Sequence, residues 1–140
     1  MVSQVVQLLR DLIALPSVNA AFLPPGDARA GEAKVADYLV NRAAMARLDI
    51  ERQPVAPESD NLIVRLQPLG QARHRILLAP HLDTVGGDDP KMYRPIKKGN
   101  KLHGRGTCDT KGSVAAMFTR LKTCPTAKSA PVKPRSFSSA

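Results

Sequence analysis

The chain has 140 residues, 43% of them hydrophobic, which is enough to bury the core of one domain. Its net charge is +9 and only 4% of its residues are aromatic, so stacking platforms for nucleic acid are excluded and no nucleic-acid partner is expected. Two cysteines exclude a disulfide framework, and no apolar run is long enough to span a membrane, so we expect a cytoplasmic protein without a membrane partner.

Two amphipathic helices are predicted in the first third of the chain. Apolar residues at helical spacing predict the first over residues 2–13, and Pro16 ends the pattern. This helix carries too many polar residues to be a signal peptide. Residues 15–31 are rich in proline and glycine and predict a loop, and the second helix is predicted over about 32–46.

Four strands and a third helix are predicted after residue 46. Residues 48–55 alternate between apolar and polar, and 61–68 form a second strand pattern. Residues 74–80 are continuously apolar after His74 and Arg75, which is typical of a strand buried on both faces. A short strand is expected over 101–107 and a helix over 109–121. Helices combined with a mixed sheet of this kind indicate the α/β class.

A histidine and two aspartates follow two of these predicted strands. His81 and Asp83 come directly after one strand, and Asp109 follows the other. Ligands in open α/β sheets collect at the carboxyl ends of strands, and residues two apart in an extended segment point the same way. Asp83 could accept the second ring N–H of a metal-bound His81. Asp109 could bridge two metal ions about 3.5–4 Å apart.

Each of these residues also has an ordinary structural interpretation. A single His-x-Asp is common in proteins that bind no metal. His74 lies between two arginines and reads as part of a solvated face, while His103 falls within a strand pattern. No base is specified near Cys108, so a buried structural thiol is a simpler interpretation than a nucleophile. On spacing alone, the metal site stays one alternative among several.

Two segments taken together resemble the M20 family of zinc amidohydrolases and metallopeptidases. They are LLAPHLDTV, residues 77–85, and KLHGRGTCDTKGSVAAM, residues 101–117. The resemblance extends over about residues 3–121 and includes LLRDLIALPSVN and the Gly31-Glu32 pair. The family includes acetylornithine deacetylase, succinyl-diaminopimelate desuccinylase, aminoacylase and glutamate carboxypeptidase. The resemblance implies the N-terminal part of a three-layer αβα zinc-peptidase-like catalytic domain with a mixed sheet, here incomplete.

The resemblance also implies roles for residues at matching positions. His81 would ligate a metal ion, Asp109 would bridge two, and Asp83 would act in catalysis by orienting His81. The cofactor would be one or two Zn²⁺ ions, with Co²⁺ as a possible substitute. A cis peptide bond is expected between Asp109 and Thr110. The three glycines that would let the backbone turn around the site are Gly104, Gly106 and Gly112.

The reaction implied is hydrolysis of an amide bond in an N-acyl amino acid or a peptide. The family places a glutamate pair, a further acidic ligand and a histidine later in the sequence, whereas all twelve acidic residues here lie at or before Asp109. We therefore expect a truncated chain with little or no activity. The alternative is a non-catalytic module that binds a partner through an exposed sheet edge. The intact family forms homodimers through a second domain.

The last residues differ in composition from the rest. Residues 1–121 form the predicted catalytic portion, and 122–140 form a basic tail rich in Pro, Ser and Lys. The tail has no helical or strand period, which is typical of disorder. A shifted reading frame from about Arg120 would permit an apolar strand there, so a frameshift is our favoured interpretation. No structure or function is assigned to the tail.

Overall fold

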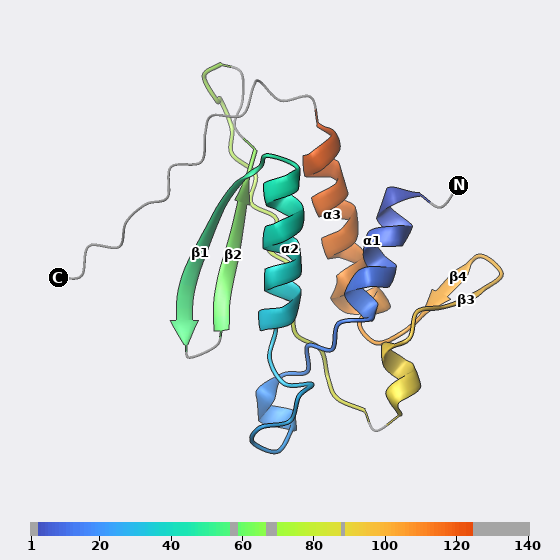
Figure 1. The fold of residues 1–140 in the computed structure, drawn as a ribbon. Helices are drawn as coiled ribbons and strands as arrows, with labels where there is room; N and C mark the ends of the chain where they lie inside the picture. The colour runs from blue at the N-terminus through green and yellow to red at the C-terminus, as the bar shows by residue number, and fades with distance from the viewer. Residues whose placement is uncertain (1–2, 57–58, 67–69, 88, 125–140) are drawn as a thin grey trace.

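Three helices and two small hairpins make up the part of the chain that the computed structural model describes, residues 3–56, 59–66, 70–87 and 89–124. The elements in chain order are α1 (Gln4–Ile13), η1 (Ala20–Phe22), α2 (Ala33–Met45), β1 (Asp49–Ala56), β2 (Ser59–Arg65), η2 (Pro90–Tyr93), β3 (Ile96–Lys98), β4 (Lys101–His103), η3 (Thr107–Lys111) and α3 (Gly112–Thr123) (Figure 1).

Helices α1 and α2 lie where the sequence predicts them. The hydroxyl of Ser3 accepts a hydrogen bond from the Val6 amide and caps α1, which ends at Ile13 before Pro16. Helix α2 begins after Glu32, and the Glu32 carboxylate accepts a hydrogen bond from the Ser59 hydroxyl of β2. That bond joins the start of α2 to the first hairpin.

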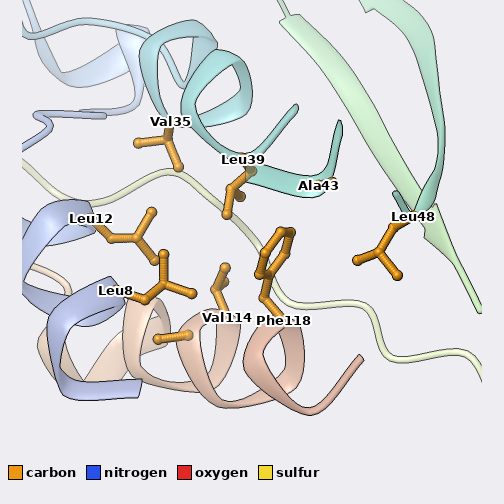
Figure 2. Close-up of a cluster of buried hydrophobic side chains, with 9 residues drawn as sticks. Leu8, Leu12, Val35, Leu39, Ala43, Leu48, Val114 and Phe118 are labelled. Carbon is orange, nitrogen blue, oxygen red and sulfur yellow. The ribbon is translucent and has the colours of Figure 1, made fainter. Parts of the chain in front are cut away.

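One aliphatic core holds the three helices together. Helix α1 packs against α3, and α2 packs against both strands of the first hairpin (Figure 1). The side chains that meet between the helices come from all three of them and from the turn before β1 (Figure 2). They are Leu8, Leu12, Val35, Leu39, Ala43, Leu48, Val114, Ala115 and Phe118.

The strands form two separate antiparallel hairpins. β1 pairs with β2, with Asp49 opposite Arg65, and β3 pairs with β4, with Ile96 opposite His103. Helices with small antiparallel sheets are compatible with the predicted α/β class. The mixed sheet is wrong for the described residues, because both of their strand pairs are antiparallel. Within these residues, no helix is long and apolar enough to cross a bilayer.

The predicted buried strand over residues 74–80 is wrong. This segment has no strand assignment, and Ile76 and Leu77 are 87% and 86% exposed. A continuous apolar run becomes a buried strand only when strands flank it and layers cover it. None of the described elements pairs with this segment, and so it stays exposed.

The last predicted strand and helix differ from the structure at their shared boundary. β4 ends at His103, and α3 starts at Gly112 instead of residue 109. Between them, Gly106 has a left-handed backbone, and Asp109 and Thr110 have non-helical dihedral angles. Helix α3 continues to Thr123, and the predicted tail beyond Cys124 lies outside the described residues.

Candidate metal centre

The side chains of His81, Asp83 and Asp109 lie close together. The strand predicted directly before His81 is not formed, and the strand predicted to lead toward Asp109 ends at His103. The His81 Nδ1 atom lies 3.0 Å from Asp83 Oδ1, and Nε2 lies 2.9 Å from Asp109 Oδ1. The hydrogen bond to Asp109 raises the pKa of His81, while desolvation opposes that rise. The imidazole is thus held between two carboxylates, and the three residues singled out in the sequence lie together.

The Asp83 side of the site is held by the segment that follows α1. The Asn19 amide Nδ2 donates to Asp83 Oδ2 at 2.9 Å, and the Ser17 hydroxyl donates to the Leu82 carbonyl at 2.8 Å. Backbone bonds join Thr84 N to Ser17 O and Asn19 N to Thr84 O. Residues 17–19 therefore act as a short pairing partner for residues 82–84.

The Asp109 side of the site is carried by the irregular turn η3. The Thr110 hydroxyl donates to the His81 carbonyl at 2.7 Å, and the Asp109–Thr110 peptide bond is cis, as the resemblance implies. Gly106 has φ of 75°, and a Cβ there would lie 2.8 Å from Thr84 Cγ2. A side chain at residue 106 would therefore push η3 away from the His81 segment.

Lys111 is the last residue of η3, and its side chain is buried in the protein. Its side chain is 1% exposed, and its Nζ donates to the carbonyls of Leu12 at 2.9 Å and Leu15 at 2.7 Å. Desolvation by burial lowers the pKa of Lys111 to about 8. The sequence alone does not single out Lys111, Ser17 or Asn19. The available signal is that all three lie in segments that carry the M20 resemblance, LLRDLIALPSVN and KLHGRGTCDTKGSVAAM.

An open cavity of about 770 Å³ lies over the site. His81 and Asp109 line it, with side chains 48% and 82% exposed. Three cationic side chains, Lys91, Arg94 and Arg105, line it as well. Three carboxylates, those of Asp83, Asp89 and Asp109, line it too, so the site opens to solvent on a surface of mixed charge.

The His81 and Asp109 donor atoms fit two ligands of a zinc ion. Zinc bonds to nitrogen and oxygen of about 2.0–2.2 Å with tetrahedral angles would place the two donor atoms about 3.3 Å apart. The observed separation of 2.9 Å requires only a small opening. A catalytic zinc site typically has three protein ligands, and the described residues contain no group of three or more His, Cys, Asp or Glu side chains arranged for a metal ion. His81 and Asp109 therefore fit part of a larger set of ligands.

The other candidate residues lie apart from this arrangement. His74 is exposed, as predicted. His103 is an exposed residue of β4 that lines the cavity. Among the described residues, it has no hydrogen bond to His81, Asp83 or Asp109. Cys108 is a free, exposed thiol, so its interpretation as a buried structural residue is wrong. The cause is its place on the outer side of η3, where Lys111 and not Cys108 points into the protein.

Comparison with known proteins shows which protein family this chain is similar to. Residues 77–134 match the model of peptidase family M20/M25/M40. The acetylornithine deacetylase of Proteus mirabilis is 33% identical over 123 residues, which cover 84% of this chain and 30% of that protein. Over the matched part of its length, the chain belongs to the M20 family.

Further M20 relatives agree with this assignment. The succinyl-diaminopimelate desuccinylase of a Methylobacterium species is 34% identical over 89 residues, which cover 57% of this chain and 22% of that protein. The acetylornithine deacetylase of Salmonella arizonae is 31% identical over 121 residues, which cover 84% of this chain. The chain spans about 30% of the length of the deacetylases it matches. The family predicted from the two sequence segments is thus confirmed.

Proposed function

We propose that this chain carries part of the metal site of an amide hydrolase whose substrates are N-acyl amino acids or peptides. One observation carries the proposal: His81 is held between the carboxylates of Asp83 and Asp109 at the edge of an open cavity. M20 relatives named as a deacetylase and a desuccinylase support hydrolysis of an acyl–nitrogen bond. The proposed fold of the whole catalytic domain is the three-layer αβα arrangement.

Each of the three side chains has a proposed role. His81 would hold a zinc ion through Nε2, and Asp109 through its carboxylate. Asp83 accepts the Nδ1 hydrogen, which fixes the tautomer and orientation of the His81 ring. A bound zinc ion would supply a water of lowered pKa, near 7, and would polarise the substrate carbonyl. Cobalt is the proposed substitute metal.

The cationic side chains in the lining of the cavity could pair with an anionic group of the substrate. Lys91, Arg94 and Arg105 line the same cavity as His81. The Arg105 Nε atom is buried and has no hydrogen-bond partner within the residues that the structure describes. The carboxylate of an N-acyl amino acid would supply oxygen acceptors for these cationic side chains, next to the amide bond to be broken.

We place the protein in a reducing compartment, the cytoplasm, consistent with its free cysteines Cys108 and Cys124.

We propose little or no turnover by the 140-residue chain itself. Hydrolysis requires a carboxylate that takes a proton from the attacking water and passes it to the leaving amine. Asp83 and Asp109 are both engaged with His81, and no acidic residue follows Asp109 in the sequence. The third carboxylate of the cavity, Asp89, accepts a hydrogen bond from the Lys91 amide at 2.8 Å. The chain would therefore bind metal without completing the reaction.

Calorimetric titration of the metal-free chain with Zn²⁺ tests the proposal. We expect one binding event, which His81→Ala abolishes. His103→Ala is the matched control, because His103 lines the same cavity without contacting Asp83 or Asp109. Equal binding by the wild type and His81→Ala would contradict the proposal. Zinc-dependent hydrolysis of N-acetyl amino acids by this chain would contradict the proposed lack of turnover.

A second candidate function is a non-catalytic binding module. The observation in its favour is the exposed apolar run Ile76, Leu77 and Leu78, of which Leu78 is 54% exposed. An extended segment without a neighbouring strand offers free backbone groups to another polypeptide. Such a module would bind its partner equally well after His81→Ala.

A further inference from the structure

Both sides of the candidate site are attached to the end of helix α1. Ser17 and Asn19, just after that helix, hold the segment of His81 and Asp83. Lys111 reaches the last turn of α1 and the residues beyond it from the other side of the site, through Leu12 O and Leu15 O. The end of α1 is therefore the common support of two segments that lie far apart in the sequence.

The Lys111 ammonium group is placed as a tether. It is buried, and its acceptors are the Leu12 carbonyl in the last turn of α1 and the Leu15 carbonyl just beyond the helix. The Leu12 carbonyl also accepts the Leu15 amide at 3.2 Å. Carbonyls at a helix C-terminus carry partial negative charge, which favours a cation there. Burying an ammonium group is costly unless its hydrogen bonds are made. An apolar side chain would fill the same space without that cost, so the hydrogen bonds are the feature that distinguishes lysine here.

The tether acts on η3 as a unit. The Lys111 amide donates to the Gly106 carbonyl at 2.9 Å, which closes the turn on itself. The Lys111 stem packs against Gly106, because a Cβ at that glycine would lie 3.1 Å from Lys111 Cδ. The end of η3 therefore cannot shift without moving the Lys111 side chain.

Asp109 depends on this turn for its position. Its side chain is 82% exposed, and within the described part of the chain it forms its hydrogen bond with His81 alone. An exposed carboxylate with one partner is placed mainly by its backbone. That backbone lies between Gly106 and Lys111, the two residues that the tether fixes.

We propose that Lys111 is a positioning residue, which ties η3 to the end of α1 and so holds the Asp109 carboxylate opposite His81. The expected effect of Lys111 on metal binding rests on the proposed function. The expected effect of Lys111 on the distance between Asp109 and His81 does not rest on it, and can be measured without metal.

The test compares Lys111→Met with the wild type in the full chain by NMR and by zinc titration. We expect the nuclear Overhauser effects between the His81 ring and the Asp109 β-protons to be lost. We also expect zinc affinity to fall about tenfold, the effect typical of removing a residue that supports a metal ligand. Val35→Ala is the control, because Val35 is fully buried in the core on α2, whereas η3 packs mainly against α1 and α3. It should lower stability and leave both readouts unchanged.

The outcomes separate the two proposals. A folded Lys111→Met with wild-type Overhauser effects would overturn the positioning role, as would their equal loss in Val35→Ala. Absence of zinc binding by the wild type would overturn the proposed function, while the Overhauser effects would still decide the role of Lys111. If Lys111→Met does not fold, Lys111→Gln keeps a neutral donor on a shorter stem. In folded Lys111→Gln, weaker Overhauser effects between the His81 ring and the Asp109 β-protons would support the tether. Overhauser effects of wild-type strength would overturn it.

Discussion

The contacts of single residues explain why the two sides of the site meet. His81 and Asp109 are 28 residues apart in the sequence, and the hydroxyl of Thr110 and the absence of a side chain at Gly106 let their segments approach. Removing the Thr110 hydroxyl or adding a methyl group at Gly106 is therefore expected to change how closely the two segments approach.

Gly106→Ala tests this close approach. We expect the free energy of unfolding to fall by about 1–3 kcal/mol from the left-handed backbone, with an additional loss from the clash with Thr84. Gly99→Ala is the matched control, because Gly99 also has a positive φ, 58°, but has nothing within 4 Å of the added methyl group. Urea denaturation measures both variants. Equal losses in the two would show that the approach to Thr84 does not matter.

At the scale of elements, the loop between α1 and α2 is joined by hydrogen bonds to the segment that carries His81 and Asp83. Val18 lies between two short pairings, one to Ala30 and one to Thr84. The Arg29 guanidinium pairs with Asp27 and donates to the Gly87 carbonyl at 3.1 Å. This loop therefore contacts the segment that follows the His-x-Asp motif.

The pH dependence of the Asp27–Arg29 pair provides a test at this scale. Hydrogen bonds from the Arg29 side chain and backbone lower the pKa of Asp27 from 3.8 to about 2. A lowered folded-state pKa means that the pair's contribution to stability is present above pH 3.8 and is lost as the pH falls through about 2. NMR titration of the Asp27 carboxyl carbon should give this low value. In Asp27→Asn, the corresponding loss of stability on acidification should disappear, and an ordinary pKa for Asp27 would contradict the pairing.

Local elements could be predicted from the sequence because local signals determine them. Helical spacing, Pro16 and the alternation in residues 48–55 give elements that agree with the structure to within a few residues. The strand over 74–80 could not be judged locally, because strand pairing depends on neighbours elsewhere in the fold. An apolar run reports a tendency to be buried, and the described elements do not cover this one.

The site could be predicted in part for the same reason. His81 and Asp109 stand in short motifs that the sequence singles out, and the structure places His81 Nε2 2.9 Å from Asp109 Oδ1. The supporting residues could not be found in this way. A lysine is usually exposed, and a Ser-Val-Asn after a helix reads as an ordinary loop. Their contacts with the site span 64 to 99 residues of sequence.

At the scale of the whole molecule, the exposed segment 76–78 is the least protected part of the surface. Three consecutive apolar side chains are exposed in a segment that pairs with no strand among the described residues. Such edges invite association with a second copy of the same chain.

We therefore expect concentration-dependent self-association of the wild-type chain in analytical ultracentrifugation. Leu77→Lys should shift it toward the monomer by placing a charge in the apolar segment. Met45→Lys is the matched control, because Met45 is also 80% exposed but lies on helix α2. A wild type that stays monomeric at all concentrations would contradict this expectation.

The measurement that most directly tests the metal centre is an anomalous diffraction map of crystals of the full chain soaked in Zn²⁺. We expect a zinc peak bonded to His81 Nε2 and the Asp109 carboxylate, with the His81 Nδ1 still directed at Asp83. A map with zinc only at other residues, such as His103 or Cys108, would contradict it.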